Sequence, residues 1–276
     1  MTIHTALRQG AALLEEAAIG APRLTAEVLL CHALGKERSW LFSHPEQQLS
    51  ETSWIHYGRS LYERLQGKPT QYITRRQEFY GRPFVVTPAV LIPRPETEHV
   101  VATALRLAPS FKRCLDIGAG SGAIGITLQL ETRGEVIAAD ISPQALAVAV
   151  QNNRRLGAGV RFVAGDLAEA FAPSTFDLVV SNPPYIPDEE KDALQREIRD
   201  YEPALALFGG PTGIEIYERL LRSAARALVP GGWLVIEIGY RAEAAIRALL
   251  GSSWREVSVS PDLAGWPRVV SARVLP

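Results

Sequence analysis

The chain has 276 residues, of which 47% are apolar and 21% are charged, and its formal net charge is −1. This length suits two domains or one large domain, and the composition is that of an ordinary globular protein. A near-neutral chain lacks the basic surplus of proteins that grip nucleic acid without regard to sequence, so we expect no direct binding of nucleic acid.

Cysteine usage and hydropathy indicate the compartment. Cys31 and Cys114 lie in apolar stretches, and two thiols in a chain of this size favour a reducing compartment over a disulfide framework. Met1–Gly10 lacks the basic-then-apolar pattern of a secretory signal, and no apolar run approaches the ~20 residues of a membrane span. We therefore expect a cytoplasmic protein without a membrane partner. The histidines lack metal-ligand spacing, so no metal site is expected.

Residues 1–70 predict helices only. Apolar residues recur at helical spacing from Ile3 to Ala18, a second helix covers 24–34, and a third surrounds Leu61. Glycine or proline follows each helix, as is common at helix ends. The pattern predicts a small helical domain, which we expect to dock a substrate.

Residues 71–92 have a different character. Glu78–Val86 places aromatic and β-branched residues on both sides of Gly81 and predicts a hairpin of two short strands within a linker. Several arginines make this linker mildly basic. They are interpreted either as a solvated face or as a docking patch for an acidic surface.

Residues 93–276 alternate strand and helix. Pro93–Glu98 is suited to begin a helix, and five buried strands follow with helices between them. The last two strands are separated by a loop alone, which predicts an antiparallel pair at the end of the sheet. This is a doubly wound α/β domain. The predicted strands cover residues 113–117, 136–140, 160–164, 176–181, 233–238, 256–260 and 268–274.

A glycine-rich loop joins the first of these strands to its helix. It contains Asp116, Gly118, Ala119, Gly120, Ser121 and Gly122. Glycines let the backbone turn sharply and let a ligand approach closely. The spacing also satisfies the looser dinucleotide fingerprint, so a nicotinamide cofactor stays open. Asp116 would oppose a pyrophosphate but favour the cationic amino-acid part of S-adenosylmethionine.

Two further carboxylates come at strand ends. Asp140 ends the second strand and could hold ribose hydroxyls, and Asp166 follows the third strand and could accept from an adenine amino group. The alternative is that both side chains cap turns. Because carboxyl ends of parallel strands meet at one sheet edge, these acids are expected near the glycine loop.

The fourth strand, Phe176–Ser181, is followed by Asn182, Pro183, Pro184 and Tyr185. The prolines stiffen the turn and force Asn182 into an extended conformation. The Asn182 side-chain oxygen and the Pro183 carbonyl could each accept a hydrogen from a planar NH2 group, with Tyr185 packed on its plane. Two such acceptors would stabilise the positive charge that grows on the nitrogen during methyl transfer. The alternative is an ordinary strand-ending turn.

With these motifs in place, the chain resembles the seven-stranded S-adenosylmethionine-dependent methyltransferases. Within them it resembles the peptide chain release factor N5-glutamine methyltransferases, the HemK/PrmC family, over nearly its whole length. The resemblance is carried by Gln71–Ile73, Glu78–Gly81, Val90–Glu98, the glycine loop, Ser181–Ile186 and Arg268–Val270. Pro93–Glu98 is the most discriminating part, since related ribosomal-protein methyltransferases differ there and amino-methylating DNA enzymes share only the Asn-Pro-Pro-Tyr core.

The resemblance implies S-adenosyl-L-methionine as methyl donor. It implies that the acceptor is the glutamine side-chain amide of the Gly-Gly-Gln motif in class-1 peptide chain release factors. It further implies that Gly118–Gly122, Asp140 and the Asp166-Leu167 pair touch the donor, while Asn182–Tyr185 hold the glutamine. Methylation of a ribosomal protein or of a nucleic-acid base stays the alternative. One departure is Arg75, where the family commonly has glycine, and this bears on the geometry of the linker turn.

Overall fold

The structure is a computed structural model that describes residues 1–275. The chain forms two compact units. The first contains Met1–Arg76 together with Gln195–Tyr201, and the second contains Gln77–Leu194 together with Glu202 and the residues that follow. The sequence predicted a separate linker over 71–92, whereas Gln71–Arg76 belong with the helices and the hairpin belongs with the second unit. Within residues 1–275, no helix is both long and apolar enough to cross a membrane.

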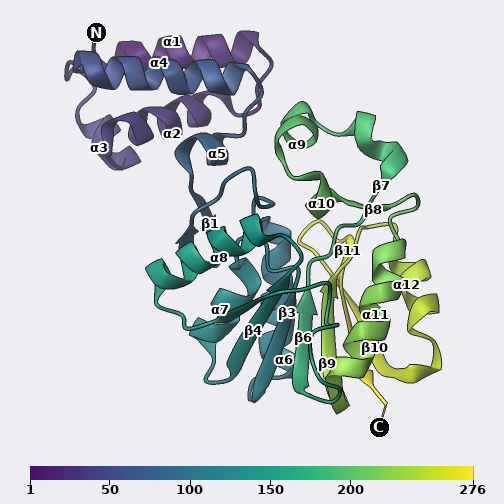
Figure 1. Ribbon diagram of the computed structural model, residues 1–276. Helices are drawn as coiled ribbons and strands as arrows, with labels where there is room; N and C mark the ends of the chain where they lie inside the picture. The colour runs from purple at the N-terminus through teal and green to yellow at the C-terminus, as the bar shows by residue number, and fades with distance from the viewer. Residues whose placement is uncertain (276) are drawn as a thin grey trace. The chain divides into compact units, whose positions relative to one another are not determined.

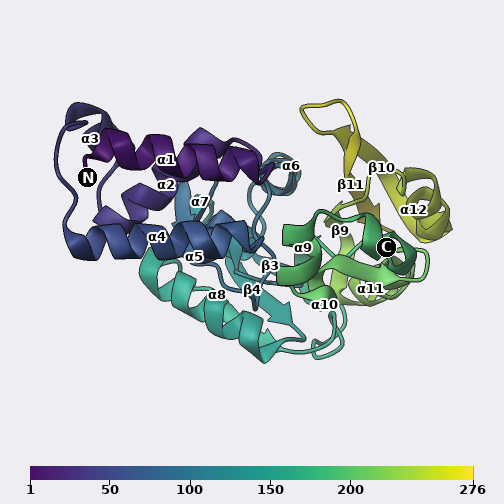
Figure 2. The same ribbon diagram turned by 90° about the horizontal axis from the view of Figure 1, so that it is seen from above.

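The first unit is helical, and α1, α2 and α4 run alongside one another (Figure 2). Its buried core includes Ile3, Leu14, Leu29 and Tyr57. Ile3 and Leu14 lie in the first helix, where apolar residues recur at helical spacing, and this spacing predicted that helix. The helices are α1 (Ile3–Glu16), α2 (Pro22–Leu34), α3 (Arg38–Ser43), α4 (Glu51–Leu65), α5 (Thr70–Thr74) and α9 (Arg196–Tyr201).

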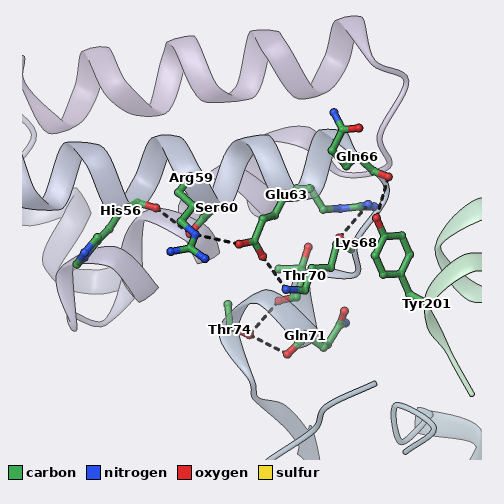
Figure 3. Close-up of polar contacts among 11 residues, drawn as sticks. His56, Arg59, Ser60, Glu63, Gln66, Lys68, Thr70, Gln71, Thr74 and Tyr201 are labelled. Atoms are coloured by element: carbon green, nitrogen blue, oxygen red, sulfur yellow. Dashed lines mark hydrogen bonds and ion pairs between the residues drawn. The ribbon is translucent and has the colours of Figure 1, made fainter. Parts of the chain in front are cut away.

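Helix α9 joins this unit from a distant part of the sequence. Glu197 forms an ion pair with Arg64. The Tyr201 hydroxyl donates to the Gln66 carbonyl at 3.1 Å (Figure 3). The chain therefore leaves the second unit after Leu194 and returns to it at Glu202.

The second unit is built on a seven-stranded sheet of order β10-β11-β9-β6-β3-β4-β5 (Figure 1). Neighbours from β9 to β5 pair in parallel, whereas β11 pairs antiparallel with β9 and with β10. The predicted doubly wound fold with an antiparallel end is confirmed. The strands are β3 (Arg113–Ile117), β4 (Glu135–Asp140), β5 (Arg161–Ala164), β6 (Phe176–Ser181), β9 (Leu228–Glu237), β10 (Trp254–Pro261) and β11 (Pro267–Val274).

Hydrophobic clusters cover both faces of this sheet. Leu115 and Val179 pack on one face with α11 (Glu215–Ala227) and α12 (Glu243–Leu250), and Cys114 and Leu178 pack on the other with α6 (Glu98–Leu107) and α7 (Ala123–Glu131). Adjacent residues of one strand point to opposite faces, so a strand buried on both faces is apolar throughout.

Shorter elements complete the second unit. The hairpin turns at Gly81, where the sequence predicted it. These elements are β1 (Gln77–Phe79), β2 (Arg82–Phe84), η1 (Pro95–Thr97), α8 (Pro143–Leu156), β7 (Ile186–Pro187), η2 (Asp188–Ala193), α10 (Ala204–Leu207), β8 (Phe208–Gly210) and η3 (Gly251–Ser253).

Candidate active site

A cavity of about 590 Å³ lies at the carboxyl ends of β3, β4, β5 and β6, and all its lining residues belong to the second unit. After β3 the chain adds β4 and β5 on one side and then crosses to β6 on the other. A sheet of this kind binds ligands at the point where its strand order reverses. The volume lies within the roughly 300–1,000 Å³ of small-molecule sites.

The glycine loop forms one wall of the cavity. Gly118 and Gly120 have φ of +75° and +54°, a left-handed backbone that favours glycine. A Cβ on either residue would meet no protein atom closer than 3.9 Å, so it would take up cavity space instead. The wall is therefore bare backbone, which is what close approach of a ligand requires.

Asp140 is fixed beside this loop. Its carboxylate accepts from the Gly120 N–H and the Ser142 N–H, each at 2.8 Å. Each oxygen has a second lone pair, which leaves acceptors for ligand hydroxyls at the cavity wall. The next residue, Ile141, is 54% exposed and lines the cavity, where its apolar surface could cover a flat ring.

Asp166 and Leu167 line the cavity after β5. Asp166 is paired with Arg219, which also lines the cavity. Leu167 has φ +53°, a conformation uncommon outside glycine, and such backbone is held in place only by its surroundings. The sequence predicted that Asp166 accepts from an adenine amino group, and the resemblance implied that Leu167 touches the donor; both residues lie at the cavity wall.

The Asn182 turn forms the opposite wall. Ser181 ends β6, and its hydroxyl donates to the Ile117 carbonyl at 2.7 Å, which ties this strand end to the glycine loop. Asn182, Pro183 and Pro184 all line the cavity. The side chain of Asn182 donates through Nδ2 to Thr97 Oγ1 at 3.1 Å.

A buried polar network lies behind Asn182. The Thr97 hydroxyl donates to Glu237 Oε2 at 2.6 Å, and the Tyr185 hydroxyl donates to Glu237 Oε1 at 3.3 Å. Glu237 is 1% exposed, and its burial raises the pKa of the carboxyl group from its ordinary value of 4.5 to about 7.

Pro93–Glu98 holds several parts of the second unit together. Arg94 is ion-paired with Glu202, which also accepts from the Ile92 N–H at 3.1 Å. Glu98 accepts from the Tyr80 N–H at 2.8 Å and so fixes the hairpin. Together with Thr97, these contacts give the hexapeptide a physical role beside the cavity.

Three predicted site residues do not line the cavity. Asp116 is 1% exposed and accepts from the Gly125 N–H at 2.8 Å, while burial raises its pKa to about 7. Gly122 begins α7, and a Cβ there would come within 2.6 Å of Ile126. Tyr185 turns its hydroxyl to Glu237. These positions favour support of the loops over direct contact, and Asp116 does not lie at the cavity wall, where the sequence predicted it.

Sequence reasoning missed several residues of the site. Thr97 lies within Pro93–Glu98, where the sequence alone indicates no role for its hydroxyl. Glu237 is a carboxylate within an apolar strand, which is a signal that the sequence carries. The segment directly after Glu202 contributes five more lining residues, namely Pro203, Leu205, Ala206, Phe208 and Gly209. No group of three or more metal-ligating side chains occurs within residues 1–275.

Comparison with known proteins agrees with this geometry. Residues 5–74 match the PrmC N-terminal domain, and residues 98–210 match the Methyltransferase small domain. A release factor glutamine methyltransferase of Koribacter versatilis is 46% identical over 99% of both chains, and one of Nitratidesulfovibrio vulgaris is 41% identical over 99% of this chain and 95% of the relative.

Among solved structures, the Thermus thermophilus 16S rRNA N2 G1207 methyltransferase, in complex with AdoMet and guanosine, is similar to this fold. It has a TM-score of 0.52 and 19% identity, covering 72% of this chain and 49% of that one. Fold and site define the protein as an S-adenosylmethionine-dependent methyltransferase. With relatives this similar over their whole length, the chain belongs to the family of release factor glutamine methyltransferases.

Proposed function

We propose that the protein transfers a methyl group from S-adenosylmethionine to the side-chain amide nitrogen of the glutamine in the Gly-Gly-Gln motif of class-1 peptide chain release factors. The relatives that match this chain over nearly their full length are named release factor glutamine methyltransferases, which supports the proposal. The observation that carries the proposal is the acceptor wall, where Asn182 and Pro183 line the cavity directly after β6.

The chemistry asked of this wall is positioning and charge stabilisation. An amide nitrogen is a weak nucleophile because its lone pair is delocalised into the carbonyl group. The Asn182 Oδ1 and the Pro183 carbonyl would each accept one hydrogen of the glutamine NH2, which orients the nitrogen and stabilises its growing positive charge. The new N–C bond would form as the bond between the methyl group and the donor sulfur breaks, with S-adenosylhomocysteine as the leaving group, and one of these protons would then pass to water.

The donor would occupy the glycine-loop side of the cavity. When bound, S-adenosylmethionine supplies an electrophilic methyl group. Gly118 and Gly120 offer bare backbone, Asp140 offers acceptors for ribose hydroxyls, and Asp166 with Leu167 lies where an adenine would be held. Asp116 and Gly122 would support this loop without lining the cavity, whereas the sequence predicted that they contact the donor directly.

Methyl transfer to a purified release factor tests the proposal. We expect incorporation of labelled methyl that disappears when the motif glutamine is replaced by glutamate. Label on a ribosomal protein or on a nucleic-acid base, with none on the release factor, would keep the donor site and overturn the substrate. Tight binding of NAD without binding of S-adenosylhomocysteine would overturn the donor site as well.

We also propose that the helical unit docks the protein substrate. Exposed Ile55, Arg59 and Tyr62 share one face of α4, at positions i, i+4 and i+7, and the two apolar side chains are 59% and 64% exposed. Exposed apolar side chains gathered on one face are typical of an interaction surface. A substrate of the translation apparatus and unpaired Cys31 and Cys114 accord with a cytoplasmic location, which belongs to the same proposal.

Docking has its own test. Ile55→Ser combined with Tyr62→Ser is expected to raise the KM for the whole release factor at least about fivefold while leaving the KM for a short Gly-Gly-Gln peptide unchanged. His56→Ser, an exposed neighbour on the same helix, serves as the matched control. An unchanged KM for the whole release factor would remove the docking role from this face.

A further inference from the structure

The hydrogen bonds behind Asn182 fix which end of its amide faces the cavity. Thr97 has a single hydroxyl hydrogen, and the 2.6 Å contact with Glu237 Oε2 has the length of a hydroxyl donating to an ionised carboxylate. With that hydrogen used, Thr97 Oγ1 can only accept from Asn182. The bonded end of Asn182 must therefore be Nδ2, at 3.1 Å, and Oδ1 is left for the cavity.

We propose that Glu237, acting through Thr97, is a positioning residue that holds the Asn182 amide with Oδ1 toward the substrate NH2 and that this orientation is lost when Glu237 takes up a proton. The inference rests on the proposed methyl transfer to an amide nitrogen. Neither Thr97 nor Glu237 touches the reacting atoms in this account.

Protonation changes the direction of the hydrogen bonds. A protonated Glu237 can donate to Thr97 Oγ1, which frees the Thr97 hydrogen to donate in turn. Rotation of the Asn182 amide by half a turn then places Oδ1 on Thr97 and Nδ2 toward the cavity. An NH2 group of Asn182 would then face the NH2 group of the substrate, donor against donor, and one of the two acceptors would be lost.

The surroundings of Glu237 put this proton uptake near neutral pH. Burial dominates and raises the pKa, and the nearby charge of Glu96 raises it further, whereas Arg268 and the hydrogen bonds of the network lower it, giving about 7. The groups that face Glu237 are Glu96 and Thr97 on η1, Tyr185 after β6, Tyr217 on α11 and Arg268 on β11. Tyr217 donates to the backbone carbonyl of Glu237 at 3.0 Å, which holds this strand end in place.

Variants of Thr97 and Glu237 separate orientation from simple packing. Thr97→Ser keeps the hydroxyl and is expected to retain kcat within about threefold together with a fall in rate below about pH 7. Thr97→Val removes the acceptor for Nδ2, and Glu237→Gln resembles the protonated state at every pH. Both are expected to lower kcat at least about tenfold and to abolish the acidic limb of the pH profile.

Controls distinguish a positioning role from damage to the fold. The Kd for S-adenosylhomocysteine is expected to stay within about twofold in all these variants, because the donor wall is untouched. Thr127→Val makes the same substitution in α7 at a buried hydroxyl that has no hydrogen-bond partner within residues 1–275, and it should leave kcat unchanged.

The outcomes are separable from those of the proposed function. A wild-type protein that does not methylate any glutamine amide would refute the proposed function. A wild-type protein that does so, while Thr97→Val or Glu237→Gln keeps its kcat and its acidic limb, would refute the positioning role alone. If Glu237→Gln fails to fold, the comparison of Thr97→Ser with Thr97→Val decides the matter.

Discussion

Ionisation of the buried Glu237 carboxyl group should lower the free energy of unfolding of the protein. The folded protein raises the pKa of this carboxyl group from 4.5 to about 7, so it binds the proton more tightly than the unfolded chain does. The stability that this proton contributes is fully present below 4.5 and is lost as the pH rises through the window up to about 7. Because Glu237 is 1% exposed, solvent does little to screen the effect.

Glu237→Gln should remove this pH dependence. Linkage with these two pKa values gives a change of about 2.5 kcal/mol between about pH 5 and about pH 8 in the difference in unfolding free energy between variant and wild type. The variant gains at the higher pH, where the buried charge is absent. Buried Asp116 also has a raised pKa, but it is present in both proteins and cancels.

Urea unfolding at the two pH values measures this difference from the shift in midpoint. Gln keeps the volume of the side chain, so cavity formation does not enter. If the difference in unfolding free energy between variant and wild type is the same at both pH values within about 0.5 kcal/mol, Glu237 has no raised pKa in the folded protein. The account of the pH-dependent orientation of Asn182 would then fail with it.

Three further variants test other parts of the account. Asn182→Ala should lower kcat by about 10²–10³ with little change in donor affinity, and an equal loss of donor affinity in calorimetry would contradict its role as acceptor. Asp140→Ala should weaken binding of S-adenosylhomocysteine at least about tenfold, and unchanged affinity would remove this residue from the donor site. Arg75→Gly should raise the unfolding free energy by about 1 kcal/mol because Arg75 ends α5 at φ +57°, and a lower midpoint in urea would show that its side chain matters more than its backbone.

The sheet was predictable because its signals are local. Buried parallel strands such as Phe176–Ser181 are short, mostly apolar runs, which a sequence shows directly. Carboxyl ends of parallel strands meet at one edge of the sheet. The order of strands along the chain was therefore enough to predict that Asp140, Asp166 and Asn182 lie near one another, and all three line the cavity. Arg75 has a left-handed backbone with φ +57°, a conformation that glycine adopts without strain.

The direction of side chains was less predictable. Asp116 and Ile117 are adjacent in β3, yet only Ile117 lines the cavity, because neighbouring residues of a strand point to opposite faces. Tyr185 comes directly after the two prolines. Its ring packs against Gly239, where an added Cβ would lie 3.2 Å from a ring atom. The spacing of a motif fixes the place of the backbone, whereas side-chain direction depends on partners such as Glu237 that are distant in sequence.

Long-range partners were outside the reach of local patterns altogether. Helix α9 has six residues and no strong periodicity, and it belongs to the helical unit through contacts such as that of Glu197 with Arg64, 133 positions apart. Glu202 likewise joins Ile92 and Arg94 across more than 100 residues. Such pairs form only in the folded structure, and local patterns in a single sequence do not reveal them.

The position of the methyl group on its acceptor tests the central claim most directly. The wild-type protein would be incubated with S-adenosylmethionine and a purified class-1 release factor, and fragment mass spectrometry would locate the modification. The account predicts one added methyl group on the side-chain nitrogen of the Gly-Gly-Gln glutamine, and none there with Asn182→Ala at the same time point. A methyl group on another residue of the release factor, or an unmodified release factor after incubation with an enzyme that binds the donor, would contradict it.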